Sequence, residues 1–156
     1  MKMETVRIYE IPDCKMVSSG IGKFGEGKLE RFSEWFSSLQ PKAIFPQDFL
    51  FWDGEWQVSG GFHWLHVYTE GMEVPEEFDV IDFKGGLYAV VTDIDGQPNE
   101  GAMEARDEFL QSHNLELDKS RAELCTIITP QTATAILGYM QMDYWTPIKP
   151  NKKEQK

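Results

Sequence analysis

Aromatic side chains at alternating positions are the residues of this sequence with the clearest potential chemistry. Between Phe62 and Tyr68 every second residue is aromatic or histidine, and alternate side chains of a strand share one face. Such a face can pack inside a sheet, or it can line a cleft and hold a cation, because each cation–π contact contributes roughly 0.5–2 kcal/mol. We expect some of these side chains to contact a ligand. The aromatic candidates are Phe51, Trp52, Trp64, Tyr68, Tyr88, Tyr139 and Trp145.

Metal-binding patterns are weak by comparison. His63 and His66 are three residues apart, which places them on opposite faces of a strand and argues against a shared metal. Cys14 and Cys125 have no metal-binding spacing, and Cys125 has no adjacent histidine that would activate it as a nucleophile. We therefore predict no metal and no other cofactor.

The composition indicates one globular domain that does not bind nucleic acid directly. The 156 residues are 41% hydrophobic and 13% aromatic, and the formal net charge is −11. A chain this acidic lacks the positive surface that binds nucleic acid, repels anionic membranes and favours cationic partners. With no secretory signal and no long apolar run, a soluble cytoplasmic protein is expected. We assign residues 1–150 to the domain and residues 151–156 to a flexible tail.

The run Phe83–Gly96, FKGGLYAVVTDIDG, predicts a central strand. Its segment Leu87–Thr92 carries largely apolar side chains on both faces, which is typical of a strand that is covered on both sides. Gly85 and Gly86 suit a sharp entry turn, because glycine adopts a positive φ without steric cost.

The order of the predicted elements recurs in the two halves of the chain. The predicted strands are Val6–Ile11, Lys15–Ser19, Phe49–Trp52, Phe62–Thr69, Phe78–Phe83, Leu87–Thr92, Leu124–Ile128 and Tyr139–Thr146, the predicted helices are 28–39 and Glu100–His113, and loops are predicted at Asp53–Gly61 and around Pro130. An offset of 74 residues aligns Tyr9 with Phe83, and an offset of 77 aligns Phe62 with Tyr139. We predict an α+β fold of tandem β-α-β-β repeats with pseudo-two-fold symmetry, in half-units of about 5–70 and 78–149. An antiparallel sheet would carry the helices on one face, with a ligand cleft between the halves.

The same residues resemble a known family. The runs FKGGLYAVVTDIDG, GYMQMDYWTPIK (138–149) and SGGFHWLHVYTEGMEVPEEFDVIDF (59–83) are similar to the GyrI-like effector-binding domain. This small-molecule module is also found in AraC- and MerR-type transcription regulators. The resemblance covers the chain from Val6 to Lys149 and is most specific at residues 85–88. It implies a tandem β-α-β-β fold whose aromatic-lined pocket between the halves often holds a buried carboxylate for organic cations.

This sequence departs from the family pattern at that carboxylate. Family members commonly carry a glutamate on the strand after the second helix, following an Arg-Pro pair, whereas the segment here is SRAELCTII (120–128). The aligned position is Glu123 or Cys125, which share a predicted strand face, so either can point into the cleft. A cysteine there would make the pocket more neutral. Asp143, on the last strand, is a second acidic candidate.

Three functions follow from these features, and we favour the first. It is a small-molecule binding protein for a lipophilic aromatic or cationic compound, a sensor or sequestering module in transcription regulation or drug response. No helix-turn-helix precedes the first predicted strand, so its partner would be a separate regulator chain or a second copy. The second function is implied by the resemblance, since some GyrI-like proteins are hydrolases that use a pocket glutamate with a tyrosine. It is a hydrolase of electrophilic small molecules that uses Glu123 with Tyr88 or Tyr139, and an apolar pocket would raise the carboxyl pKa to suit a general base. The third is an acidic inhibitor of a DNA-handling enzyme.

Overall fold

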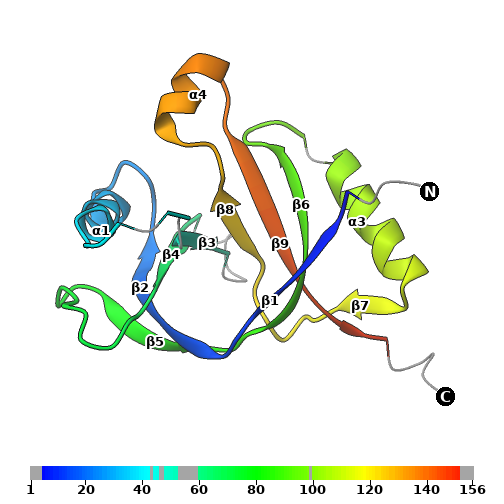
Figure 1. The fold of residues 1–156 in the computed structure, drawn as a ribbon, viewed down its shortest axis with the longest axis horizontal. Helices are drawn as coiled ribbons and strands as arrows, with labels where there is room; N and C mark the ends of the chain where they lie inside the picture. The colour runs from blue at the N-terminus through cyan, green and yellow to red at the C-terminus, as the bar shows by residue number, and fades with distance from the viewer. Residues whose placement is uncertain (1–4, 43, 46–47, 53–59, 99, 152–156) are drawn as a thin grey trace. The chain divides into compact units, whose positions relative to one another are not determined.

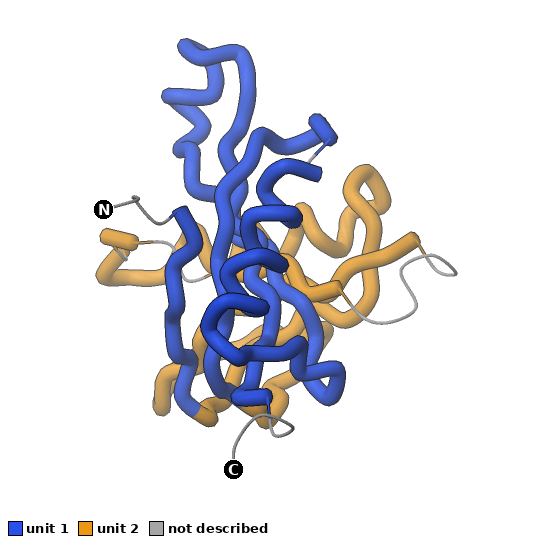
Figure 2. Tube along the Cα trace, turned by 90° about the vertical axis from the view of Figure 1, so that its right-hand side faces the viewer, with its two compact units in different colours: residues 1–12, 85–156 blue, residues 13–84 orange. Residues whose placement is uncertain are grey.

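The structure, a computed structural model, describes residues 5–42, 44–45, 48–52, 60–98 and 100–151. The chain forms two compact units, which are shown in Figure 2. Unit 1 consists of Met1–Pro12 with Gly85–Lys156, and unit 2 consists of Asp13–Lys84. Most of the predicted loop Asp53–Gly61 and of the predicted tail lies outside the described residues. None of the described helices is long and apolar enough to span a membrane.

Unit 1 is an antiparallel sheet with a helix on one face. Its strands lie in the order β1 (Arg7–Ile11), β6 (Gly86–Ile94), β9 (Gln141–Pro150) and β8 (Leu124–Ile127), and β7 (Leu115–Leu117) also pairs with β9 (Figure 1). Helix α3 (Glu100–Ser112) buries Leu110 against Ala89 and Val91 of β6. The other set of β6 side chains, which includes Tyr88, therefore lies on the opposite face of this sheet.

Unit 2 has the same architecture. Its strands lie in the order β3 (Asp48–Phe51), β4 (Phe62–Val67), β2 (Cys14–Gly22) and β5 (Asp79–Phe83), all antiparallel. At the start of helix α1 (Lys28–Ser37), Glu30 accepts hydrogen bonds at 2.9 Å from the amides of Gly25, in the preceding loop, and of Gly27, the residue that caps the helix. The buried Phe32 then packs edge-on against Phe78 at 4.9 Å between ring centroids. Together the two units confirm the predicted α+β fold with antiparallel sheet and packed helices.

The pairing register repeats between the units. Tyr9 lies opposite Tyr88 where β1 pairs with β6, and Phe83 lies opposite Cys14 where β5 pairs with β2. The predicted offset of 74 residues takes Tyr9 to Phe83 and takes Tyr88 back to Cys14. The second pair is therefore the repeat equivalent of the first. Each unit thus contains the first strand of the other sequence half. The tandem repeat inferred from the sequence therefore has a counterpart in the strand pairing.

Two elements differ from the predictions in the second half of the chain. The predicted loop around Pro130 contains helix α4 (Gln131–Leu137), and β7 was not predicted at all. Helix α4 ends at Gly138, whose φ of 84° places it in the left-handed region that glycine tolerates. No residue of α4 is buried, so the helix has no apolar stripe that the sequence could reveal. Because this helix ends late, β9 begins at Gln141 and leaves Tyr139 outside the strand.

Candidate functional site

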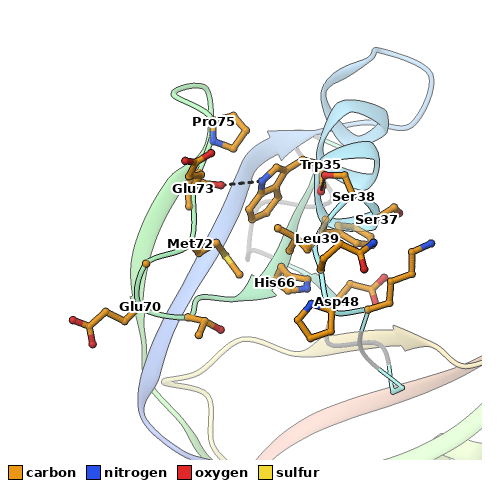
Figure 3. A pocket seen from close by; sticks show the side chains of 17 residues that line it. Trp35, Ser37, Ser38, Leu39, Asp48, His66, Glu70, Met72, Glu73 and Pro75 are labelled. Atoms are coloured by element: carbon orange, nitrogen blue, oxygen red, sulfur yellow. Dashed lines mark hydrogen bonds between the residues drawn. The ribbon is translucent and has the colours of Figure 1, made fainter.

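A large cavity lies within unit 2, at the C-terminal end of α1. It has a volume of about 1090 Å³ and is lined by residues 35–42 and 69–75 together with Asp48 and His66 (Figure 3). Known ligand cavities are commonly about 300–1000 Å³, so this one has room for a drug-sized compound. Its walls come from the end of α1, the segment that follows it, the start of β3, the end of β4 and the connection from β4 to β5.

Aromatic rings form one wall of the cavity. The helix places Trp35 and Phe36 next to each other at its last turn, and both face His66 of β4. The His66 ring stacks on Phe36 at 5.6 Å and meets Trp35 edge-on at 5.9 Å between ring centroids. The Trp35 indole Nε1 also donates a hydrogen bond to the Glu73 carbonyl at 3.1 Å, as the dashed line in Figure 3 shows. This bond ties the 69–75 segment to α1 across the cavity.

The charged groups of the lining are mostly acidic. The lining contains three acidic residues, Asp48, Glu70 and Glu73, and one basic residue, Lys42. The two glutamates are exposed, whereas Asp48 is half-buried at the start of β3. Asp48 lies directly opposite His66 in the pairing of β3 with β4, and Figure 3 shows their side chains side by side. This arrangement favours a cation over an anion.

Burial raises the pKa of Asp48. Hydrogen bonds from its own amide and from the Trp64 side chain, together with the nearby His66, act in the opposite direction. On His66, Nδ1 lies 2.9 Å from the Val67 carbonyl, and a carbonyl oxygen only accepts, so Nδ1 carries the proton. In this tautomer, Nε2 is an acceptor. The cavity therefore combines aromatic surface with hydrogen-bond acceptors.

Four of the residues predicted to bind a ligand lie in unit 2, and none of them lines this cavity. Trp64 contacts two residues of the cavity lining. Its ring packs edge-on against Phe36 at 5.2 Å between ring centroids, and its side chain donates a hydrogen bond to Asp48. Phe51 packs on His63, Trp52 packs on Phe62, and the amide of Tyr68 donates to the Lys15 carbonyl.

Three further predicted residues share one face of the unit 1 sheet. Tyr88, Asp143 and Trp145 lie on the face opposite α3, where the Tyr88 and Trp145 rings are 5.8 Å apart. Asp143 is buried there and accepts hydrogen bonds from Arg7 at 2.5 Å and Thr92 at 2.6 Å. Its contact with Asp143 raises the pKa of Arg7. Asp143 is thus an ion-paired carboxylate.

The structure places the remaining predicted residues in other surroundings. Cys125 is buried and lies directly opposite Tyr144, which packs into the α3 core, so Cys125 is on the helix side of the sheet. Glu123 is exposed and precedes β8, so it does not share a strand face with Cys125. Tyr139 is 40% exposed beyond α4, while Tyr88 is fully buried. The Glu123–Tyr88 pair proposed for hydrolysis therefore combines an exposed carboxylate with a buried tyrosine, whereas both members of the Glu123–Tyr139 pair are exposed.

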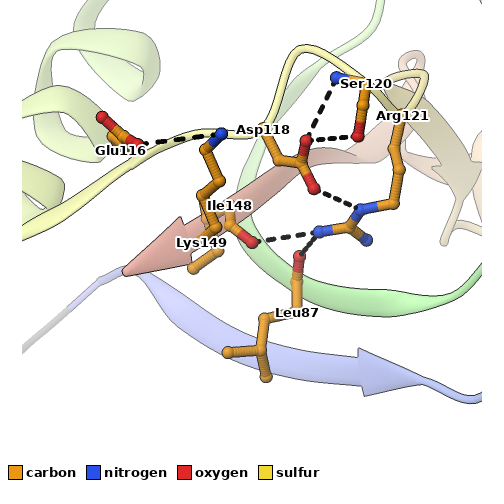
Figure 4. Close-up of polar contacts among 7 residues, drawn as sticks. All are labelled: Leu87, Glu116, Asp118, Ser120, Arg121, Ile148 and Lys149. Atoms are coloured by element: carbon orange, nitrogen blue, oxygen red, sulfur yellow. Dashed lines mark hydrogen bonds and ion pairs between the residues drawn. The ribbon is translucent and has the colours of Figure 1, made fainter. Parts of the chain in front are cut away.

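A buried polar cluster around Arg121 joins several segments of unit 1 (Figure 4). Arg121 pairs with Asp118 at 2.9 Å, and their side chains are only 5% and 15% exposed. Arg121 also donates to the carbonyls of Leu87 at 2.9 Å and Ile148 at 3.0 Å, and its guanidinium carbon lies 4.8 Å from the centre of the Tyr88 ring. Because this cluster joins β6, β9 and the 118–121 turn, we assign it a structural role.

Sequence reasoning missed most of the cavity. Trp35 and Phe36 have the spacing of a helix core, and Asp48 stands alone before a short strand, so nothing local marks them as a site. Three features of the sequence together could have indicated the cavity. They are the aromatic pair near the end of the predicted helix, the Gln-Pro pair that ends this helix and the acidic segment 70–75, which contains Gly and Pro.

Comparison with known proteins identifies the fold. No protein-family profile and no curated protein matches the sequence. Among solved structures, the EcmrR C-terminal domain is 10% identical, with 96% of this chain and 99% of that chain covered and a TM-score of 0.61. EcmrR in its DNA complex is 10% identical, with a TM-score of 0.64, and 93% of this chain matches 57% of that one. SAV2435 bound to tetraphenylphosphonium is 12% identical, with 98% of each chain covered and a TM-score of 0.50. At these identities the likeness establishes the fold.

Proposed function

We propose that this protein is a GyrI-like effector-binding protein that takes a lipophilic aromatic cation into the unit 2 cavity. It would act as a sensor or sequestering module in transcription regulation or drug response. The observation that carries the proposal is the cavity of about 1090 Å³ with an aromatic wall and three carboxylates against one lysine.

The solved structures of similar fold support this function. SAV2435 is bound to tetraphenylphosphonium, which is an aromatic cation, and EcmrR is seen in a complex with DNA. This chain spans about 57% of the length of that EcmrR chain. Any connection of this protein to DNA is therefore part of what we propose. Trp64 is the sequence-predicted ligand residue that we keep as part of this site, through its contacts with Asp48 and Phe36.

The physical basis is the pairing of aromatic surface with negative charge. A cation over the face of Trp35 or Phe36 gains roughly 0.5–2 kcal/mol for each ring, more when the site excludes water. The apolar part of the ligand gains about 25 cal/mol for each Å² of surface removed from water. A carboxylate in a partly buried site adds an attraction that bulk water would screen.

The test is binding of tetraphenylphosphonium and of naphthalene-2-sulfonate, an aromatic anion, to the purified protein. We expect the cation to raise the melting temperature with increasing concentration and to change the tryptophan fluorescence, because Trp35 lines the site. The anion should do neither. Absence of a shift with tetraphenylphosphonium and with other aromatic cations would overturn the proposal.

A pair of variants locates the site. Trp35→Leu should weaken cation binding about 2- to 30-fold, which corresponds to the loss of one cation–π contact. Tyr139→Leu is the matched control, since this exposed residue of unit 1 was predicted from the sequence to contact the ligand. A loss in Tyr139→Leu with none in Trp35→Leu would place the ligand outside the cavity.

A further inference from the structure

The hydrogen-bond acceptors of the cavity restrict the class of ligand that it can bind, an inference that rests on the function proposed above. Asp48 differs from the other carboxylates of the lining because it is half-buried, while Glu70 and Glu73 are exposed to solvent. An exposed carboxylate keeps its water shell whether or not a ligand is present. A partly buried carboxylate lacks part of that shell and gains most from a new hydrogen-bond donor.

The residues that the structure describes satisfy Asp48 only in part. A carboxylate offers about four lone-pair sites. Within the described part of the chain, Asp48 accepts hydrogen bonds from its own amide and from the Trp64 side chain, and burial outweighs them in its pKa. Asp48 therefore retains accepting capacity inside the cavity.

A second acceptor lies beside it. In the tautomer in which Nδ1 of His66 donates to the Val67 carbonyl, Nε2 is an acceptor. His66 is directly opposite Asp48 on the neighbouring strand, and its ring is held by Trp35 and Phe36. The acceptors and the aromatic wall thus occupy the same part of the cavity.

We propose that this cavity selects aromatic cations that carry an N–H group, with Asp48 as the residue that determines the selection. A protonated amine can donate to the Asp48 carboxylate while its aromatic part packs on Trp35 and Phe36. A fully substituted ammonium or phosphonium has the same charge but no donor, so it leaves the carboxylate unsatisfied. A charge-assisted hydrogen bond contributes about 1.5–3 kcal/mol net, equivalent to about 10- to 150-fold in affinity.

The test compares two ligands that differ in one methyl group. The first is N,N-dimethyl-2-(naphthalen-2-yl)ethylamine, protonated at pH 7, and the second is its N,N,N-trimethylammonium analogue. Calorimetric titration of the wild-type protein should show at least about 10-fold tighter binding of the protonated amine. Equal affinities, or tighter binding of the trimethylammonium compound, would overturn the inference and leave the proposed function standing. If neither compound nor tetraphenylphosphonium binds, both fail.

Two variants of cavity-lining residues test whether Asp48 determines the preference for the protonated amine. Asp48→Asn keeps the size and an acceptor for Trp64 but removes the charge, and it should bring the two affinities within about twofold of each other. Glu70→Gln removes an exposed carboxylate of the same lining and should leave the preference intact. A preference that survives in Asp48→Asn would contradict the role of this residue. The wild-type comparison remains decisive if the variant does not fold.

Discussion

Gly85→Ala is expected to lower the free energy of unfolding by more than about 3 kcal/mol. A Cβ atom at this position would lie 1.9 Å from the Ile11 carbonyl oxygen and 2.6 Å from the Pro12 carbonyl carbon. Both atoms belong to the backbone, so no side-chain rotation can relieve the overlap. The end of β1 would have to move away from β6, and the pairing of Ile11 with Gly86 would be lost. Urea titration followed by circular dichroism measures the effect.

Gly101→Ala is the matched control for this substitution. Gly101 lies in α3, and a Cβ there has no neighbour within 4 Å. Because alanine has the higher helix propensity, this change should raise the free energy of unfolding by about 0.5–1 kcal/mol. A Gly85→Ala protein that unfolds within about 1 kcal/mol of the wild type would show that β1 does not approach Gly85 so closely.

Arg121→Met should destabilise the protein by about 3–5 kcal/mol, because it leaves a mostly buried carboxylate without its ionic partner. Asp118 would lose the ion pair, and the carbonyls of Leu87 and Ile148 would lose a donor. Methionine has a similar length, so little of the loss comes from a cavity. Lys149→Met is the control, since Lys149 and Glu116 are 3.8 Å apart with side chains 45% and 39% exposed. That pair should contribute less than about 1 kcal/mol.

The same cluster predicts a dependence of stability on pH. Hydrogen bonds from Ser120 and then from Arg121 hold the pKa of Asp118 well below its usual range. A carboxyl group of this kind stabilises the folded state above its unfolded pKa of about 3.9, and the contribution is lost as the pH falls toward the folded value. The wild type should therefore lose stability below about pH 4 more steeply than Arg121→Met. Parallel curves for the two proteins would show that Arg121 does not lower this pKa.

Local patterns predicted much of the fold. The alternating apolar faces of Leu87–Thr92 correspond to β6, with Ala89 and Val91 against α3 and Tyr88 on the other face. The offset of 74 residues matches the register of two separate strand pairs. These features are readable because side-chain periodicity and glycine turns are properties of neighbouring residues. Helix α4 was missed because it buries nothing and leaves no such pattern.

Ten residues were expected from the sequence to bind a ligand, and none of them lines the unit 2 cavity. Acidity and aromatic content favoured a cation site, and the cavity of unit 2 has an aromatic wall and three acidic residues against one lysine. Its aromatic residues, Trp35 and Phe36, read as helix core in the sequence, and its half-buried acid, Asp48, belongs to no motif. A predicted acid, Asp143, is instead paired with Arg7, a residue more than a hundred positions away in the chain.

The sequence by itself determined the α+β repeat and the two faces of the Phe83–Gly96 strand, and its acidity led to the expectation of a positively charged partner. Each of these depends on local periodicity or on total charge. Only the tertiary structure decided which carboxylate is ion-paired and which lines a cavity, because pairing and burial depend on long-range contacts. Strand pairing sets Asp48 against His66 at the edge of a cavity, and it sets Asp143 against a neutralising arginine.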